Sequence, residues 1–181
     1  SINNMNAEIR DCTFRNILSR GIRLQSSHAI VENNHLEWIT GPAMTFNGHP
    51  GFWGEADNAR HVQIRGNTII SACHSDMRFA RAAIVVMSHG DKEKTDLITD
   101  IIFENNTIKN SAGSAFYLNG CRNVTLKNNT ILNWGSEPFP KDTHAKAERS
   151  DNYGKAILVE HAIDLELVNN HLKNPGPHGS R

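Results

Sequence analysis

The chain has 181 residues, of which 38% are hydrophobic, and it balances 19 basic against 19 acidic side chains. This length is enough for one domain with its own core. The balanced charge argues against a nucleic-acid-binding protein, which needs an excess of Lys and Arg. No apolar run approaches the ~20 residues of a transmembrane helix, so we expect no contact with a membrane interior.

The cysteines are odd in number and irregularly spaced, at Cys12, Cys73 and Cys121. This pattern argues against a disulfide framework and against a zinc site built from paired cysteines. We therefore expect buried, unreactive thiols. No metal-ligand spacing occurs elsewhere, and we expect no metal and no other cofactor.

A pair of adjacent polar residues, usually two asparagines, recurs along the whole chain. The second residues of these pairs are, in chain order, Cys12, Asn34, Asn67, Asn106, Asn129 and Asn170. Their spacings are 22, 33, 39, 23 and 41 residues, which indicates a unit of 22 to 23 residues with insertions in three of the steps. Repeats of this length are typical of solenoids.

Alternating apolar residues on both sides of each pair predict two short strands that meet at a corner. Asparagine suits such a corner because it tolerates a left-handed backbone. Its amide can also bond to the equivalent residue of the next coil. We therefore expect an asparagine ladder along the stack of coils.

A third strand follows the corner, at 21–26, 42–48, 82–88, 114–120 and 155–161. Three strands in a turn of 22 residues predict an all-β fold, a right-handed parallel β-helix of about six coils. A leucine-rich repeat and a β-propeller fit the spacing less well. Residues 1–181 are expected to form one domain of this type. Because neither end carries a polar cap, we expect that domain to be a fragment of a longer solenoid.

The insertions never lengthen the asparagine corner. They follow the third strand at 48–60 and 88–100, and they precede it at 71–81 and 133–153, where a short helix is expected from residue 141. All of them flank the same sheet, so we expect walls along its outer face. Binding and catalytic groups concentrate on loops held by a rigid scaffold.

Alternation divides the third strands into inward and outward side chains. The inward ones are Ile22, Met44, Ile84, Phe116 and Ile157, followed by Leu24, Phe46, Val86, Leu118 and Val159. The outward ones are Arg23, Thr45, Val85, Tyr117 and Leu158, followed by Gln25, Asn47, Met87, Asn119 and Glu160. The last row is rich in amides and carboxylates, which suits a hydroxyl-rich ligand. The alternative is a solvated sheet face.

The predicted walls add groups that suit carbohydrate chemistry. A tryptophan can stack on a sugar ring, and glycosidases use a pair of carboxylates as acid, base or nucleophile. The catalytic candidates are Glu55, Asp76 and Asp91, although no spacing selects a pair among them. The substrate-binding candidates are Arg23, Gln25, Asn47, His49, Trp53, Asp57, Arg78, His89, Tyr117, Asn119 and Glu160. The alternative is that these charged side chains are only solvated.

Residues 8 to 132 resemble the β-helix exo-α-1,3-galactosidases, which remove terminal galactose from blood-group-B-type glycans. The resemblance rests on Arg20 and Gly21, the corner at Asn33 and Asn34, the strand from Gly41 to Ala43, the loop with Trp53 and Glu55, and the segment from Ile64 to Thr68. It implies an inverting hydrolysis, with Arg23, Trp53 and Glu55 as substrate contacts.

In that family adjacent aspartates on an earlier coil supply the catalytic core, and this sequence contains no Asp-Asp pair. We therefore expect the catalytic coil to precede Ser1. The chain is then the downstream part of the β-helix domain, and the remainder of that domain is its partner.

Two other functions remain open. A polysaccharide lyase of this architecture needs a base, for which Arg81 or His89 is available, and often calcium held by clustered acids. A non-catalytic carbohydrate-binding solenoid needs neither, since the fold does not fix the function. In all three cases the expected partner is an oligosaccharide or polysaccharide, and we expect a secreted or periplasmic protein.

Overall fold

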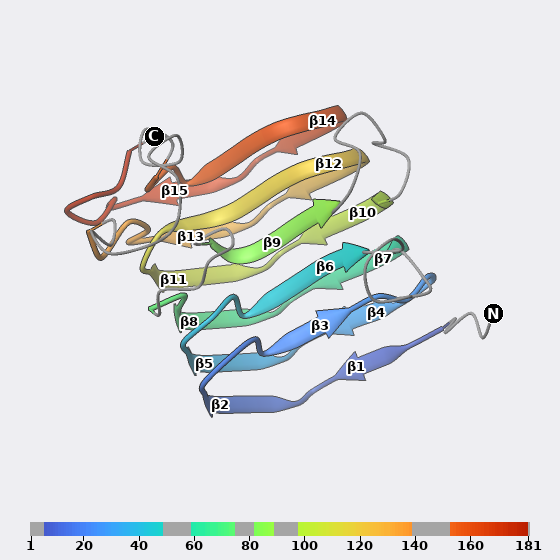
Figure 1. Cartoon of the computed structure of the whole chain (residues 1–181), viewed down its shortest axis with the longest axis horizontal. Helices are drawn as coiled ribbons and strands as arrows, with labels where there is room; N and C mark the ends of the chain where they lie inside the picture. The colour runs from blue at the N-terminus through green and yellow to red at the C-terminus, as the bar shows by residue number, and fades with distance from the viewer. Residues whose placement is uncertain (1–5, 49–58, 75–81, 89–97, 139–152, 181) are drawn as a thin grey trace.

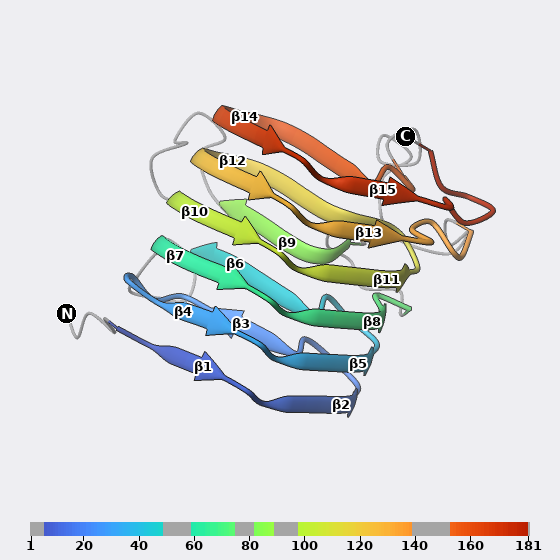
Figure 2. The same ribbon diagram turned by 180° about the vertical axis from the view of Figure 1, so that it is seen from behind.

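The computed structural model describes residues 6–48, 59–74, 82–88, 98–138 and 153–180. In these residues each coil runs through short strands that lie parallel to those of the neighbouring coils. Figures 1 and 2 show the coils stacked from β1 and β2 at one end to β14 and β15 at the other. The predicted all-β parallel β-helix is confirmed.

The strands form three rows. The first row contains β1 (Glu8–Arg10), β4 (Ile30–Glu32), β7 (Arg60–Arg65), β10 (Ile98–Glu104) and the second halves of β12 (Ser114–Lys127) and β14 (Ile157–Val168). The second row contains β2 (Thr13–Ile17), β5 (His35–Ile39), β8 (Thr68–Ala72), β11 (Thr107–Ser111), β13 (Thr130–Leu132) and β15 (His171–Lys173). The third row contains β3 (Ile22–Leu24), β6 (Met44–Gly48), β9 (Ala82–Ser88) and the first halves of β12 and β14.

The first and third rows face each other across the core. The chain of β12 and β14 bends from one row into the other at Gly120 and His161, which have positive φ angles of 65° and 49°. Phe103 of the first row makes edge-to-face contacts with Phe46 and Phe116 of the third row, at centroid distances of 5.5 and 5.3 Å. The outward faces of these two rows therefore lie on opposite sides of the stack.

Two of the three cysteines match the expectation of buried thiols. Cys73 and Cys121 are buried, and burial raises the pKa of the Cys121 thiol to about 12. Cys12 is exposed, so the expectation is wrong there. Cys12 lies in the end coil of the described stack, and within the described residues another coil packs against only one side of it.

The two residues of each corner have different roles. The first residue has a left-handed backbone, with φ between 50° and 64° in Asp11, Asn33, Gly66, Asn105, Asn128 and Asn169. From the second corner on, the second residue points inward and forms a column, defined here as the asparagine column of Asn34, Asn67, Asn106, Asn129 and Asn170. The first four are buried, and Asn170 is partly buried. Asn67 illustrates the pattern: its Nδ2 donates to Asn106 Oδ1 at 2.9 Å and to the Val31 carbonyl at 2.9 Å.

Two further columns of left-handed residues lie five residues before and five residues after the corner. The column before it contains Asn6, His28, His61, Asp100, Asn123 and Asp164, and the column after it contains Asn16, Trp38, Ser71, Asn110, Asn133 and Asn174. Residues other than glycine rarely have positive φ, and Asn, Asp and His do so most readily. This five-residue spacing bends the chain at regular intervals and was not predicted from the sequence.

We predict that Asn106→Leu lowers the free energy of unfolding by about 1–3 kcal/mol, because it removes buried hydrogen bonds without replacing their donors and acceptors. Asn106 Oδ1 accepts from the Asn67 side chain at 2.9 Å, and Asn106 Nδ2 donates to the Ile64 carbonyl at 2.9 Å. Urea unfolding followed by circular dichroism measures the change. Lys109→Leu, at an exposed position of the next strand, is the control, and equal effects of both substitutions would contradict the prediction.

Candidate functional site

The outward side chains of the third row form two aligned columns, defined here as the floor. Strand register aligns Arg23, Thr45, Val85, Tyr117 and Leu158 in one column. It aligns Asn47, Met87, Asn119 and Glu160 in the other, and Gln25 follows the end of β3. The register therefore places five predicted substrate-binding residues, Arg23, Asn47, Tyr117, Asn119 and Glu160, on one outward face, and the sixth, Gln25, directly follows β3.

Hydrogen bonds join the polar residues at each end of the floor. At the β3 end, Arg23 Nε donates to Asn47 Oδ1 at 3.2 Å. At the β14 end, Asn119 Nδ2 donates to Tyr117 Oη at 2.9 Å, and Tyr117 Oη donates to Glu160 Oε2 at 2.7 Å. Tyr117 thus fixes the position of a carboxylate by a short, charge-assisted bond.

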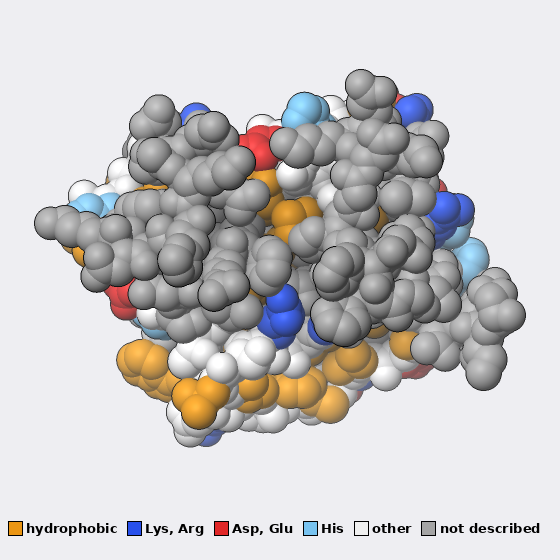
Figure 3. All heavy atoms as spheres, viewed as in Figure 1, with side chains coloured by type: hydrophobic (Ala, Val, Ile, Leu, Met, Phe, Trp, Pro, Cys, Tyr) orange, Lys and Arg blue, Asp and Glu red, His pale blue; other side chains and the backbone are white. Residues whose placement is uncertain are grey.

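The centre of the floor is apolar and buried. Val85 and Met87 of β9 pack with Ala82 and Tyr117, and the exposed fractions of Val85, Met87 and Tyr117 are 3%, 7% and 3%. Figure 3 shows this face, on which acidic side chains near the β14 end, a hydrophobic group, and basic side chains towards the β3 end remain visible.

Burial separates the floor residues that a ligand can reach from those that hold them. Arg23 is exposed, and Gln25, Asn119 and Glu160 are partly exposed. Tyr117 and Asn47 are buried behind them, which favours a positioning role for these two. Arg23 on β3 and Asn119 on β12 are three strands apart, or roughly 14 Å, and Glu160 on β14 lies one strand further. This spacing suits an extended ligand that carries many hydroxyl groups.

A second group of side chains links the ends of the two insertions at 71–81 and 133–153. His74 Nδ1 lies 2.5 Å from Glu137 Oε1, and the Trp38 ring packs against the His74 ring at 6.1 Å. The hydroxyl of Tyr153 donates to the carbonyls of Ala112 and Glu137 at 2.7 and 2.8 Å. The sequence contains no signal for the His74–Glu137 pair, because its members are 63 residues apart.

The remaining predicted site residues lie outside the described residues. These are His49, Trp53, Glu55, Asp57, Asp76, Arg78, His89 and Asp91, together with the lyase candidate Arg81 and the short helix expected from residue 141. All three catalytic candidates therefore stay predictions. In the described ranges, no group of three or more His, Cys, Asp or Glu side chains is placed to hold a metal ion. No helix of that part of the chain could cross a membrane.

Comparison with known proteins assigns the family. Residues 1–180 match the family model of the right-handed β-helix region, and the chain belongs to this family. The hand of the helix therefore agrees with the sequence analysis.

One curated relative is similar over 140 residues, 70% of this chain, with 28% identity: alpha-1,3-galactosidase B of Phocaeicola vulgatus. The match confirms the predicted resemblance to β-helix α-1,3-galactosidases. It covers 23% of the relative, so the chain spans about a quarter of the length of that protein.

We predict that Tyr117 and Glu160 are energetically coupled. Replacing Tyr117 by Phe removes the hydroxyl that donates to Glu160 Oε2 at 2.7 Å, and replacing Glu160 by Gln removes the charge on the acceptor. A double-mutant cycle of Tyr117→Phe and Glu160→Gln, measured by urea unfolding, should give a coupling energy of about 0.5–3 kcal/mol. Additive effects of the two substitutions would show that the bond does not form in solution.

Proposed function

We propose that this chain forms the substrate-binding groove of a glycoside hydrolase that removes α-linked galactose with inversion. The observation that supports this most is the floor, where two hydrogen-bonded polar groups flank an apolar centre on one outward face. The similarity to alpha-1,3-galactosidase B adds the class of sugar and linkage.

The described groups suit the binding of a neutral oligosaccharide. Glu160 accepts hydrogen bonds from sugar hydroxyls while Tyr117 donates to its Oε2. Because this bond already fixes the Glu160 side chain, little side-chain entropy is lost when the sugar binds. Asn119 supplies both a donor and an acceptor, and the exposed Arg23 supplies donors at the far end of the floor. Contacts at both ends select a chain of sugars over a single ring.

Catalysis in this proposal belongs to a pair of carboxylates outside the floor. An inverting glycosidase places two carboxyl groups about 6.5–9.5 Å apart, so that a water molecule fits between the base and the sugar. The candidates are Glu55, Asp76 and Asp91, or aspartates on a coil outside this sequence, as the family resemblance implies. The floor residues orient the substrate in either case.

The test is hydrolysis of α-1,3-linked galactosyl oligosaccharides, with the anomer of the first-formed galactose read by NMR. We expect galactose release with inversion and no effect of a chelator. Glu160→Gln should raise KM several-fold, because a charged acceptor of the sugar hydroxyls is lost. Arg15→Gln, an exposed position of β2 on another face, is the control and should leave KM unchanged.

The other outcomes separate the competing functions. Glycan binding without turnover, both in the chain alone and in a version extended upstream, would identify a non-catalytic binding solenoid. Release of unsaturated uronates that stops on chelation would identify a lyase. Failure to bind any glycan, in the chain alone and in a version extended upstream, would overturn the proposal.

A further inference from the structure

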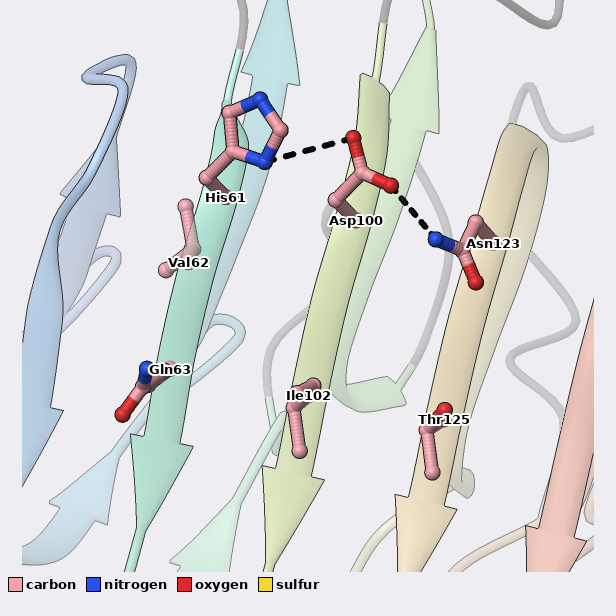
Figure 4. Close-up of a pocket in the computed structure, with 7 residues that line it drawn as sticks. All are labelled: His61, Val62, Gln63, Asp100, Ile102, Asn123 and Thr125. Atoms are coloured by element: carbon pink, nitrogen blue, oxygen red, sulfur yellow. Dashed lines mark hydrogen bonds and ion pairs between the residues drawn. The ribbon is translucent and has the colours of Figure 1, made fainter.

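A shallow pocket of about 230 Å³ lies on the outward face of the first row, over β7, β10 and β12 (Figure 4). It lies on the other side of the solenoid from the floor. Ile102 lines the pocket, whereas its chain neighbour Phe103 points into the core against Phe46 and Phe116 of the third row. The pocket is therefore separate from the site described above.

One edge of the pocket is a row of three side chains from the left-handed column that precedes the corner, in which Asp100 contacts His61 and accepts a hydrogen bond from Asn123. His61 Nδ1 lies 3.4 Å from Asp100 Oδ2, and Asn123 Nδ2 donates to Asp100 Oδ1 at 2.5 Å. Figure 4 shows the three side chains pointing toward one another across adjacent strands. The ring of His28 stacks on that of His61 at 4.8 Å and extends this edge by one coil.

The carboxylate of Asp100 is fixed in its charged form. Burial raises its pKa, whereas hydrogen bonds from Asn123 and Thr99 lower it. The neighbouring His61 and Arg60 lower it further, so the pKa of Asp100 lies below the ordinary value of 3.8. At neutral pH this edge of the pocket therefore carries the ionised Asp100 carboxylate in a fixed position. The carboxylate accepts hydrogen bonds and repels other anions.

The bottom of the pocket combines an apolar centre with neutral polar neighbours. Ile102 is 41% exposed, and strand register places it between Gln63 and Thr125. Within the described residues, the Gln63 amide nitrogen and the Asn123 amide oxygen have no hydrogen-bond partner, so both are available to a ligand.

Beyond the pocket, the next outward position along these strands carries charges that neutralise one another. Lys127 Nζ lies 3.2 Å from Glu104 Oε1, and Arg65 Nε donates to Glu32 Oε1 at 2.6 Å. Paired charges of this type are largely satisfied and attract little further charge. They leave the neutral amides and Asp100 as the groups that select the ligand, since the Thr125 hydroxyl already donates to Glu166 Oε2 at 3.5 Å.

We propose that this pocket is a second carbohydrate site, which binds one neutral pyranose ring. A pyranose has an apolar face, which fits Ile102, and an edge of hydroxyls, which fits the Asp100 carboxylate and the amides of Gln63 and Asn123. The volume is below the ~300–1,000 Å³ of sites for larger ligands, which limits the occupant to about one ring. The negative charge of Asp100 disfavours uronates, because they carry a carboxylate of their own.

The proposal shares its ligand class with the proposed function but depends on different residues. The two sites face opposite sides of the stack, so a single short oligosaccharide cannot occupy both. The second site therefore holds another branch or chain, which raises the local concentration of a polymeric substrate and leaves small substrates unaffected.

Methyl NMR tests the two sites separately in one titration of the full chain. The Ile102 δ1 methyl reports on the pocket, and the Met87 ε methyl reports on the floor. With methyl α-galactoside and methyl α-glucoside as probes, we expect saturable shifts of the Ile102 signal, with a dissociation constant on the order of 1 mM. Galacturonic acid, which has the same ring size and a negative charge, should shift it much less.

Matched variants complete the test. Ile102→Ala and Asn123→Ala should each weaken sugar binding at the pocket and leave the Met87 response unchanged. In Ile102→Ala, where the isoleucine methyl is lost, the Gln63 side-chain amide reports binding at the pocket. Leu18→Ala, at a 90% exposed position elsewhere, is the control and should change neither. An Ile102 signal that does not move with any neutral sugar overturns the inference, even if Met87 responds. Movement of Ile102 without Met87 supports it and counts against the floor as the sugar site.

Discussion

In-register stacking of the coils is the constraint on which the rest of this structure depends, and the asparagine column enforces it. The amides of Asn67, Asn106 and Asn129 each accept from the coil before and donate to the coil after, and these three residues are at most 1% exposed. Leaving a buried amide unsatisfied costs more than its hydrogen bond contributes when made. A slip of one residue would break the column and turn every core side chain outward.

Both candidate sites are consequences of this register. The floor exists because residues 24 to 43 positions apart along the chain, such as Arg23 and Asn47 or Tyr117 and Glu160, lie side by side in the two columns of adjacent coils. The pocket exists for the same reason, since Asp100 and Asn123 are 23 residues apart. A rigid stack of this kind positions polar groups without loops and at low entropic cost, which is what a binding site for hydroxyl-rich ligands requires.

Much of the fold could be predicted from the sequence because the repeat is local. Apolar alternation around Asn106 and Asn129 identifies the strands, and the same alternation separates Ile84 and Phe116, which are buried in the core, from the outward floor. The insertions were also located, because the corner keeps a constant length while the flanks of the third strand vary. These features can be predicted from the repeat spacing alone, and that spacing is visible in a single sequence.

The missed features depend on contacts between coils. His61 and Asp100 have no short-range relation in the sequence, and His74 meets Glu137 only after two coils have stacked. The left-handed columns left a weak trace, because His, Trp and Ser replace Asn at several of their positions, as at His28, Trp38 and Ser71. The sequence also does not separate the two roles of the corner, namely the left-handed bend of the first residue and the inward hydrogen bonding of the second. Both positions are usually asparagine, so only the structure shows which one bends the backbone and which one joins the column.

The most direct test of the stacking is the exchange rate of asparagine side-chain amide protons, measured by NMR in deuterated water. Asn67, Asn106 and Asn129 should exchange far more slowly than the exposed Asn33 and Asn105, which occupy the same corners but point outward. Equal exchange rates in the two sets would mean that the column does not form. The shared floor and the pocket would then have no structural basis.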